Sequence, residues 1–139
     1  MVCPRLILLV ENDPADAARI THAFQETGPS GRLVHRDDCE RTLQYLHEPQ
    51  GPKPAFVLLG LDLPDRAAFR FLEAVKADET LRMIPVVVLA GSDEECDVSE
   101  SFTLGGAGYV TKSADASTLR EQTAAILAYW SLSLLPRIP

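Results

Sequence analysis

The chain has 139 residues, enough for one domain with its own hydrophobic core, and its 46% hydrophobic and 24% charged residues are typical of a globular protein. The formal net charge of −7 lacks the basic footprint of a non-specific nucleic-acid binder, so direct DNA binding is excluded as the expected activity. No segment reaches the ~18 apolar residues that indicate a membrane span, and no signal peptide is evident. We therefore expect a cytoplasmic protein with neither a nucleic-acid nor a membrane partner.

Five apolar or β-rich runs alternate with helical patterns along the chain. The runs are residues 6–10, 32–36, 55–61, 85–90 and 108–111, and the expected helices are residues 14–27, 38–47, 66–77, 94–104 and 116–128 or beyond. Three runs, LILLV, FVLLGL and VVVLA, are continuously apolar, which is typical of strands buried on both faces of a parallel sheet. The alternation predicts an α/β fold, a doubly wound five-stranded parallel sheet in a three-layer α/β/α sandwich.

In such a sheet, ligands bind beyond the carboxyl ends of the strands, where the strand order reverses. The residues that follow the expected strands and carry chemistry are Glu11, Asn12, Asp13, Asp62 and Lys112. Carboxylate oxygens at this edge would suit Mg²⁺, and a lysine could hold a phosphoryl group beside the metal. Asp13 precedes Pro14 and also has the position of a helix N-cap.

Four segments resemble a known family, and together they span nearly the whole chain. LILLVENDPAD, PAFVLLGLDLP, IPVVVLAGS and GGAGYVTKS occur in the order and at the spacing of a response-regulator receiver domain. The VE-x-x-PAD start and the tail AYWSLSLLPRIP are most similar to single-domain regulators that partner bacterial phytochromes. The resemblance implies a flavodoxin-like (βα)5 fold and a role in two-component, or phosphorelay, signal transduction. Members of the family take a phosphoryl group from a histidine kinase onto an aspartate, using Mg²⁺.

The resemblance also shows where this chain departs from the family. The phospho-acceptor aspartate stands four residues before the proline of its motif, and counting back from Pro64 gives Gly60. One of the two acids after the first strand is replaced by Asn12, and the switch hydroxyl residue is replaced by Ala90. The lysine is retained as Lys112 and the switch aromatic as Tyr109. Glycine cannot be phosphorylated, so we expect a pseudo-receiver in which the usual chemistry is lost.

Three residues near this position have alternative interpretations. Asp62 could serve as a substitute phospho-acceptor, although it is more often a solvated loop acid or a capping residue. Lys112 could hold an anion, but a partly buried ammonium is better explained by pairing with Glu11 or Asp62. Glu11 and Asp13 could bind Mg²⁺ weakly or not at all, because hard cations lose affinity as ligand charge falls.

The function that we expect is non-enzymatic and requires no cofactor. A receiver-like protein without an acceptor would act through protein–protein contacts with a sensor histidine kinase or another signalling protein. Two other functions remain open: a receiver that is phosphorylated at Asp62, and a module that binds an anion or small ligand around Lys112.

The end of the chain predicts a further contact surface. We divide the chain into a receiver-like domain, residues 1–130, and an apolar tail, residues 131–139. The last helix and the tail carry more apolar side chains than one helix face can bury: Tyr129, Trp130, Leu132, Leu134 and Leu135. We expect these residues to form a homodimer interface, as the resemblance to phytochrome-partner regulators implies; the alternative is that the tail folds back onto its own domain.

Overall fold

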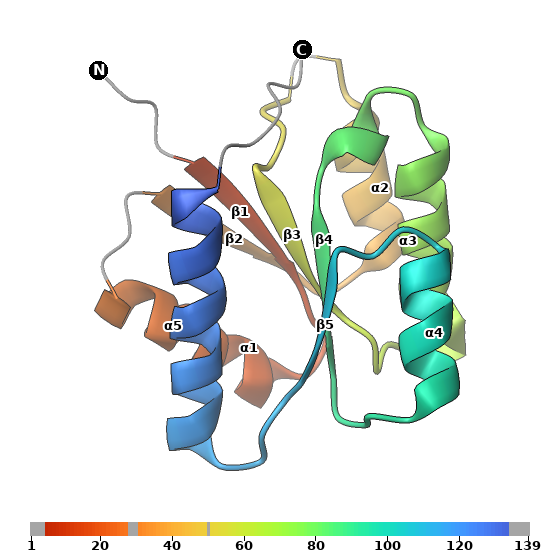
Figure 1. The fold of residues 1–139 in the computed structure, drawn as a ribbon. Helices are drawn as coiled ribbons and strands as arrows, with labels where there is room; N and C mark the ends of the chain where they lie inside the picture. The colour runs from red at the N-terminus through yellow and green to blue at the C-terminus, as the bar shows by residue number, and fades with distance from the viewer. Residues whose placement is uncertain (1–4, 28–30, 50, 134–139) are drawn as a thin grey trace.

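The three continuously apolar runs form the three central strands of one parallel sheet. A computed structural model describes residues 5–27, 31–49 and 51–133 and shows the sheet between two layers of helices (Figure 1). The strands are β1 (Arg5–Val10), β2 (Gly31–Arg36), β3 (Phe56–Gly60), β4 (Val86–Ala90) and β5 (Gly108–Thr111), in the order β2-β1-β3-β4-β5. All neighbouring strands are parallel, so the predicted flavodoxin-like fold is confirmed.

Five α-helices connect or follow these strands. They are α1 (Pro14–Thr27), α2 (Cys39–His47), α3 (Ala67–Ala77), α4 (Glu95–Thr103) and α5 (Ala116–Leu132). The observed ends of strands and helices lie within one residue of the predicted ends, except at the end of α5. Local capping explains this agreement, because Asp13 accepts from the amide of Ala15 and Asp38 accepts from the amide of Arg41. In the described part of the chain, no helix has the length and apolar character needed to cross a membrane.

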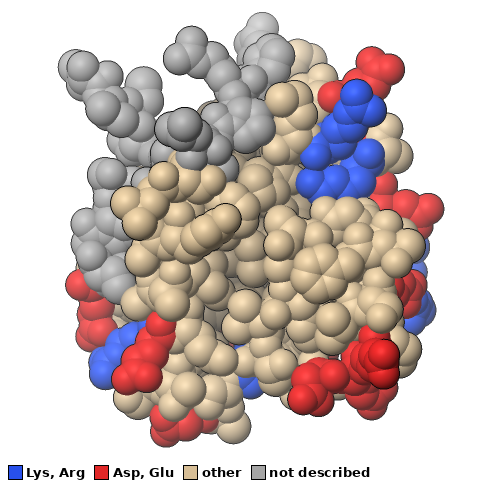
Figure 2. Space-filling model, in the orientation of Figure 1, with Lys and Arg blue, Asp and Glu red and all other residues tan. Residues whose placement is uncertain are grey.

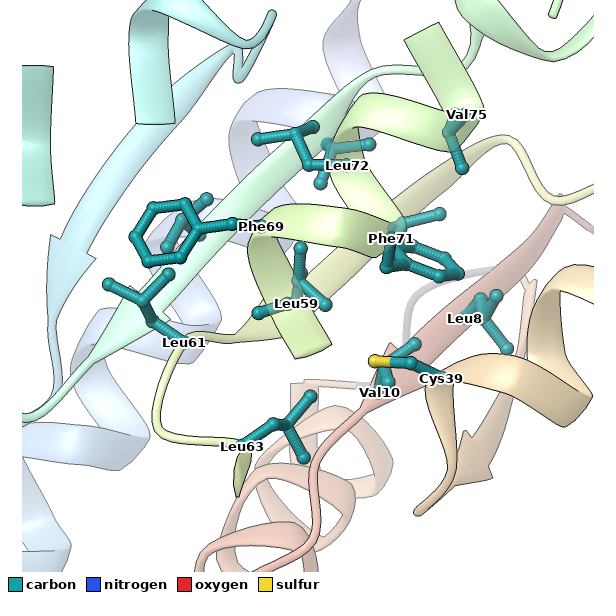
Figure 3. Packing of buried hydrophobic residues seen from close by; sticks show 14 of the residues in the cluster. Leu8, Val10, Cys39, Leu59, Leu61, Leu63, Phe69, Phe71, Leu72 and Val75 are labelled. Atoms are coloured by element: carbon teal, nitrogen blue, oxygen red, sulfur yellow. The ribbon is translucent and has the colours of Figure 1, made fainter. Parts of the chain in front are cut away.

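Alternate side chains of the central strands enter two separate cores. Leu8, Val10 and Leu59 pack with α3 on one side of the sheet, as Figure 3 shows. Leu9 and Leu58 pack with α1 and α5 on the other side. Because both faces are covered, the central strands contain no polar residue after Arg5 of β1, which is why they appear as unbroken apolar runs in the sequence.

The strand order places the candidate residues at one edge. From β1 the order continues to β2 in one direction, whereas from β3 it continues to β4 and β5 in the other. The carboxyl ends of β1 and β3 are therefore adjacent at the point where the order reverses. Gly60 is the last residue of the central strand β3, and Glu11 directly follows β1.

The last helix agrees with the open-ended prediction of a helix from residue 116 to 128 or beyond. Helix α5 continues to Leu132, so the boundary that we drew between residues 130 and 131 falls inside its last turn. Trp130 stacks on Phe56 with ring centroids 5.5 Å apart and therefore belongs to the core of its own domain. Tyr129 and Leu132 are 63% and 85% exposed. Leu134 and Leu135 lie outside the described residues.

Candidate functional site

The carboxylate of Glu11 lies against Gly60, the residue that the sequence resemblance places at the acceptor position. A Cβ atom built on Gly60 would be 2.6 Å from Glu11 Oε2, which is closer than real Cβ contacts. The Glu11 side chain is only 1% exposed, and its other oxygen, Oε1, accepts from the amide of Asp13 at 3.3 Å. The absence of a side chain at Gly60 is what makes room for this buried carboxylate.

Lys112 neutralises part of this acidic pocket. Its side chain is 7% exposed, and Nζ lies 3.0 Å from Glu11 Oε2, 2.9 Å from Asp16 Oδ2 and 3.8 Å from Asp62 Oδ2. Burial lowers the pKa of Lys112, but the hydrogen bonds with Asp16 and Glu11, together with their charges, outweigh burial and raise it above its ordinary value. The predicted pairing of Lys112 with Glu11 or Asp62 is therefore present, with Glu11 as the closer of the two.

Asp16 is a site residue that sequence reasoning missed. It lies in the first turn of α1, one helical turn after the N-cap Asp13, and its carboxylate reaches Lys112 from the helix. The PAD segment contained Asp16, but helical spacing alone did not indicate that α1 would present this residue to the end of β5. Only the packing of α1 beside α5 brings the two charges together.

The loop after β3 supplies a second acid with a different environment. The Asp62 side chain is 54% exposed, and its Oδ2 accepts from the amide of Gly91 at 2.9 Å. Ala90, at the switch position, is fully buried and contributes no polar group. Asn12 is exposed and lines a cleft of about 670 Å³ between α2 and α3.

Tyr109 on β5 is held inward by the loop after β4. Its hydroxyl donates to the carbonyl of Ser92 at 2.7 Å. Burial raises the pKa of Tyr109, and the nearby carboxylates of Asp97, Asp62 and Asp93 act in the same direction. The switch aromatic that the sequence predicted is therefore in contact with the loop that starts at Gly91.

The donor set of this pocket does not fit a magnesium ion. Both Glu11 oxygens already have partners in Lys112 and Asp13, and Asp13 Oδ1 caps α1. No group of three or more His, Cys, Asp or Glu side chains in the described ranges is arranged to hold a metal. A cation here would have to displace the Lys112 ammonium, which already compensates the acidic charge.

The fold and the position of the pocket define a class of protein, a flavodoxin-like receiver with its site at the carboxyl edge of the sheet. Residues 7–124 match the family of the response regulator receiver domain. The chain therefore belongs to this family, whose members act in two-component signalling.

Relatives and solved structures agree with this assignment. The chain is 36% identical over 130 residues to the probable methanogenesis regulatory protein FilR2 of Methanothrix harundinacea, covering 91% of this chain and 84% of FilR2. It is 32% identical over 132 residues to the response regulator Rcp1 of Synechocystis sp., covering 91% and 89% of the two chains. The structure of the phosphorylated cyanobacterial phytochrome response regulator RcpA matches with a TM-score of 0.90 at 33% identity, over 97% of this chain and 100% of RcpA. The resemblance to phytochrome-associated regulators is thus confirmed.

Proposed function

We propose that this protein is a pseudo-receiver of two-component signalling that works through protein–protein contacts, without phosphorylation at position 60 and without Mg²⁺. The observation that carries the proposal is the buried Glu11 carboxylate, which lies 2.6 Å from the position of a Cβ atom on Gly60. An acceptor side chain is absent, and the space that it would enter is already filled by a negative charge. The proposal assigns no enzymatic activity and places the protein in the cytoplasm with a sensor histidine kinase or another signalling protein as its partner.

The surroundings of Lys112 bear on the two other functions. An anion-binding module would need a cation with free hydrogen-bonding capacity, but the Lys112 ammonium lies within 4 Å of three carboxylates. A substitute acceptor would need an in-line approach to Asp62, whose Oδ2 already accepts from the Gly91 amide. Asp62 is nevertheless exposed, so chemical phosphorylation is the decisive test.

Incubation with acetyl phosphate and Mg²⁺ is expected to leave the intact mass of the protein unchanged. The physical reason is that Gly60 offers no nucleophile and the pocket lacks the ligands that would hold a metal beside the phosphoryl group. Intact-protein mass spectrometry after a mild quench of the reaction measures the result. An adduct of one phosphoryl group that disappears in Asp62→Asn, but persists in the matched variant Asp65→Asn, would overturn the proposal and make Asp62 the acceptor.

A second part of the proposal concerns self-association. Figure 2 shows that the centre of the face formed by α4, β5 and α5 is free of charged side chains, while acidic and basic groups gather at its margins. Phe102, Tyr129 and Leu132 on α4 and α5 are 51%, 63% and 85% exposed. Large exposed apolar side chains on elements that border an uncharged surface favour an interface. We propose a homodimer through this face.

Sedimentation at micromolar concentration in EDTA is expected to show a dimer, because the proposed assembly depends on neither phosphate nor metal. Replacement of both Tyr129 and Leu132 by Ser is expected to raise the dissociation constant of the dimer by about tenfold or more, because each substitution removes apolar contact area from the interface. The control is His22→Ser, an exposed residue on α1 and not on α4, β5 or α5. A wild-type protein that remains monomeric under these conditions would refute the homodimer.

A further inference from the structure

Asp62 lies where three loops of the pocket meet. It belongs to the segment after β3, accepts a hydrogen bond from Gly91 after β4, and lies 3.8 Å from the ammonium of Lys112 after β5. These contacts are not local, since the Asp62 and Gly91 positions are 29 residues apart in the chain. The exposed Asp62 carboxylate therefore contacts the segments that follow the neighbouring strands β4 and β5, while it belongs to the segment after β3.

The lack of a side chain at Gly91 permits this contact. A Cβ atom at Gly91 would lie 3.2 Å from Asp62 Oδ2, tighter than most real contacts, so the absence of a side chain lets the carboxylate approach the amide closely. The preceding residue, Ala90, is fully buried and cannot supply a polar side chain to the pocket. Within the described chain, the Asp62 carboxylate is thus the side chain that binds the first residue after β4.

A second hydrogen bond restrains the loop after β4. The next residue, Ser92, accepts the hydroxyl hydrogen bond of Tyr109 through its carbonyl, and α4 begins shortly afterwards at Glu95. The segment after β3 also contacts α4 directly, because Arg66 forms an ion pair with Glu100. Asp62, Tyr109 and Arg66 therefore hold the β4–α4 unit at three separate points.

We propose that Asp62 is a positioning residue that fastens the β4–α4 loop to the pocket and so sets the placement of Tyr109 and the start of α4. The inference rests on the proposed function, because Tyr109 and α4 belong to the face of α4, β5 and α5 that we propose as the contact face. The Asp62 carboxylate is part of the chain, so it makes this contact without phosphorylation. The contact face therefore has one arrangement whether or not a phosphodonor is present.

Hydrogen–deuterium exchange tests this role in three variants. Asp62→Ala removes both the hydrogen bond and the charge, Asp62→Asn keeps an oxygen that can accept from Gly91, and Asp65→Asn is a control on an exposed acid in the same segment. We expect peptides covering residues 93–104 to exchange about three- to tenfold faster in Asp62→Ala, with a smaller change in Asp62→Asn and none in Asp65→Asn. Peptides of β1 and α2 should be unaffected.

A second readout separates positioning from general stability. If the contact face depends on Asp62, the dimer dissociation constant of Asp62→Ala should rise by about threefold or more while the midpoint of thermal unfolding changes little. Unchanged exchange in residues 93–104, or an equal increase throughout the domain, would overturn the positioning role. Failure of the proposed function has a different signature, since a phosphoryl adduct on the wild-type protein does not depend on these exchange rates.

Discussion

Replacement of Gly60 by Asp is expected to destabilise the protein by roughly 2–4 kcal/mol in the absence of metal, because it buries a second carboxylate against Glu11. The new Cβ alone would lie 2.6 Å from Glu11 Oε2, so the Glu11 side chain must leave its position beside Lys112. Gly60→Ala is the matched control, since it displaces Glu11 without adding a charge. Chemical unfolding in EDTA measures both variants, and an equal loss in both would show that bulk rather than charge decides the effect.

Restoring both missing acids is expected to restore sensitivity to Mg²⁺. Gly60→Asp alone should bind the cation weakly, because Asn12 adds no charge, whereas Gly60→Asp with Asn12→Asp places three carboxylates together. At ten times the dissociation constant, binding stabilises a domain by about 1.4 kcal/mol, or roughly 4–6 °C in the unfolding midpoint. The double variant should show this shift and either single variant less. Equal shifts in all three would mean that the pocket is built differently.

Removal of the Lys112 charge is expected to destabilise the protein by an amount similar to that for Gly60→Asp. Lys112→Met leaves the Glu11 carboxylate, which is 1% exposed, without its nearest cation, and breaking a buried pair from one side costs about 3–5 kcal/mol. The free energy of unfolding from urea titration measures this loss. In the double variant Glu11→Gln with Lys112→Met, most of the loss should be recovered, because no unpaired buried charge remains. A double variant as unstable as Lys112→Met would instead indicate that packing of the lysine stem matters most.

The same interaction predicts the alkaline limit of stability. The folded protein raises the pKa of Lys112 above its value in the unfolded chain, so the stabilisation is fully present below the unfolded pKa and is lost as pH rises through the folded pKa. Wild-type protein should therefore lose more stability than Lys112→Met between about pH 9 and pH 11. Parallel urea titrations at the two pH values give the difference, in which other alkaline titrations cancel. A wild-type loss no larger than that of Lys112→Met would contradict the assignment.

The amino-acid sequence was sufficient for the fold and for the positions of the pocket. Unbroken apolar runs such as LILLV and VVVLA can be buried only on both faces of a sheet, and caps such as Asp13 mark where helices begin. Counting from Pro64 placed Gly60 at the acceptor position, because motif spacing in a strand and its loop is local. Strand, turn and cap preferences act over a few residues, so these features can be read from the chain itself.

The partners of each charge were decided only by the tertiary structure. Asp16 reaches Lys112, 96 residues away, because α1 packs beside α5 at the end of β5. Asp62 accepts a hydrogen bond from Gly91, and Trp130 stacks on Phe56 in the core. A buried ammonium selects its partners by desolvation and distance in the folded chain. Several acids near the strand ends were equivalent in the sequence, and only packing determined which of them lie within 4 Å of Lys112.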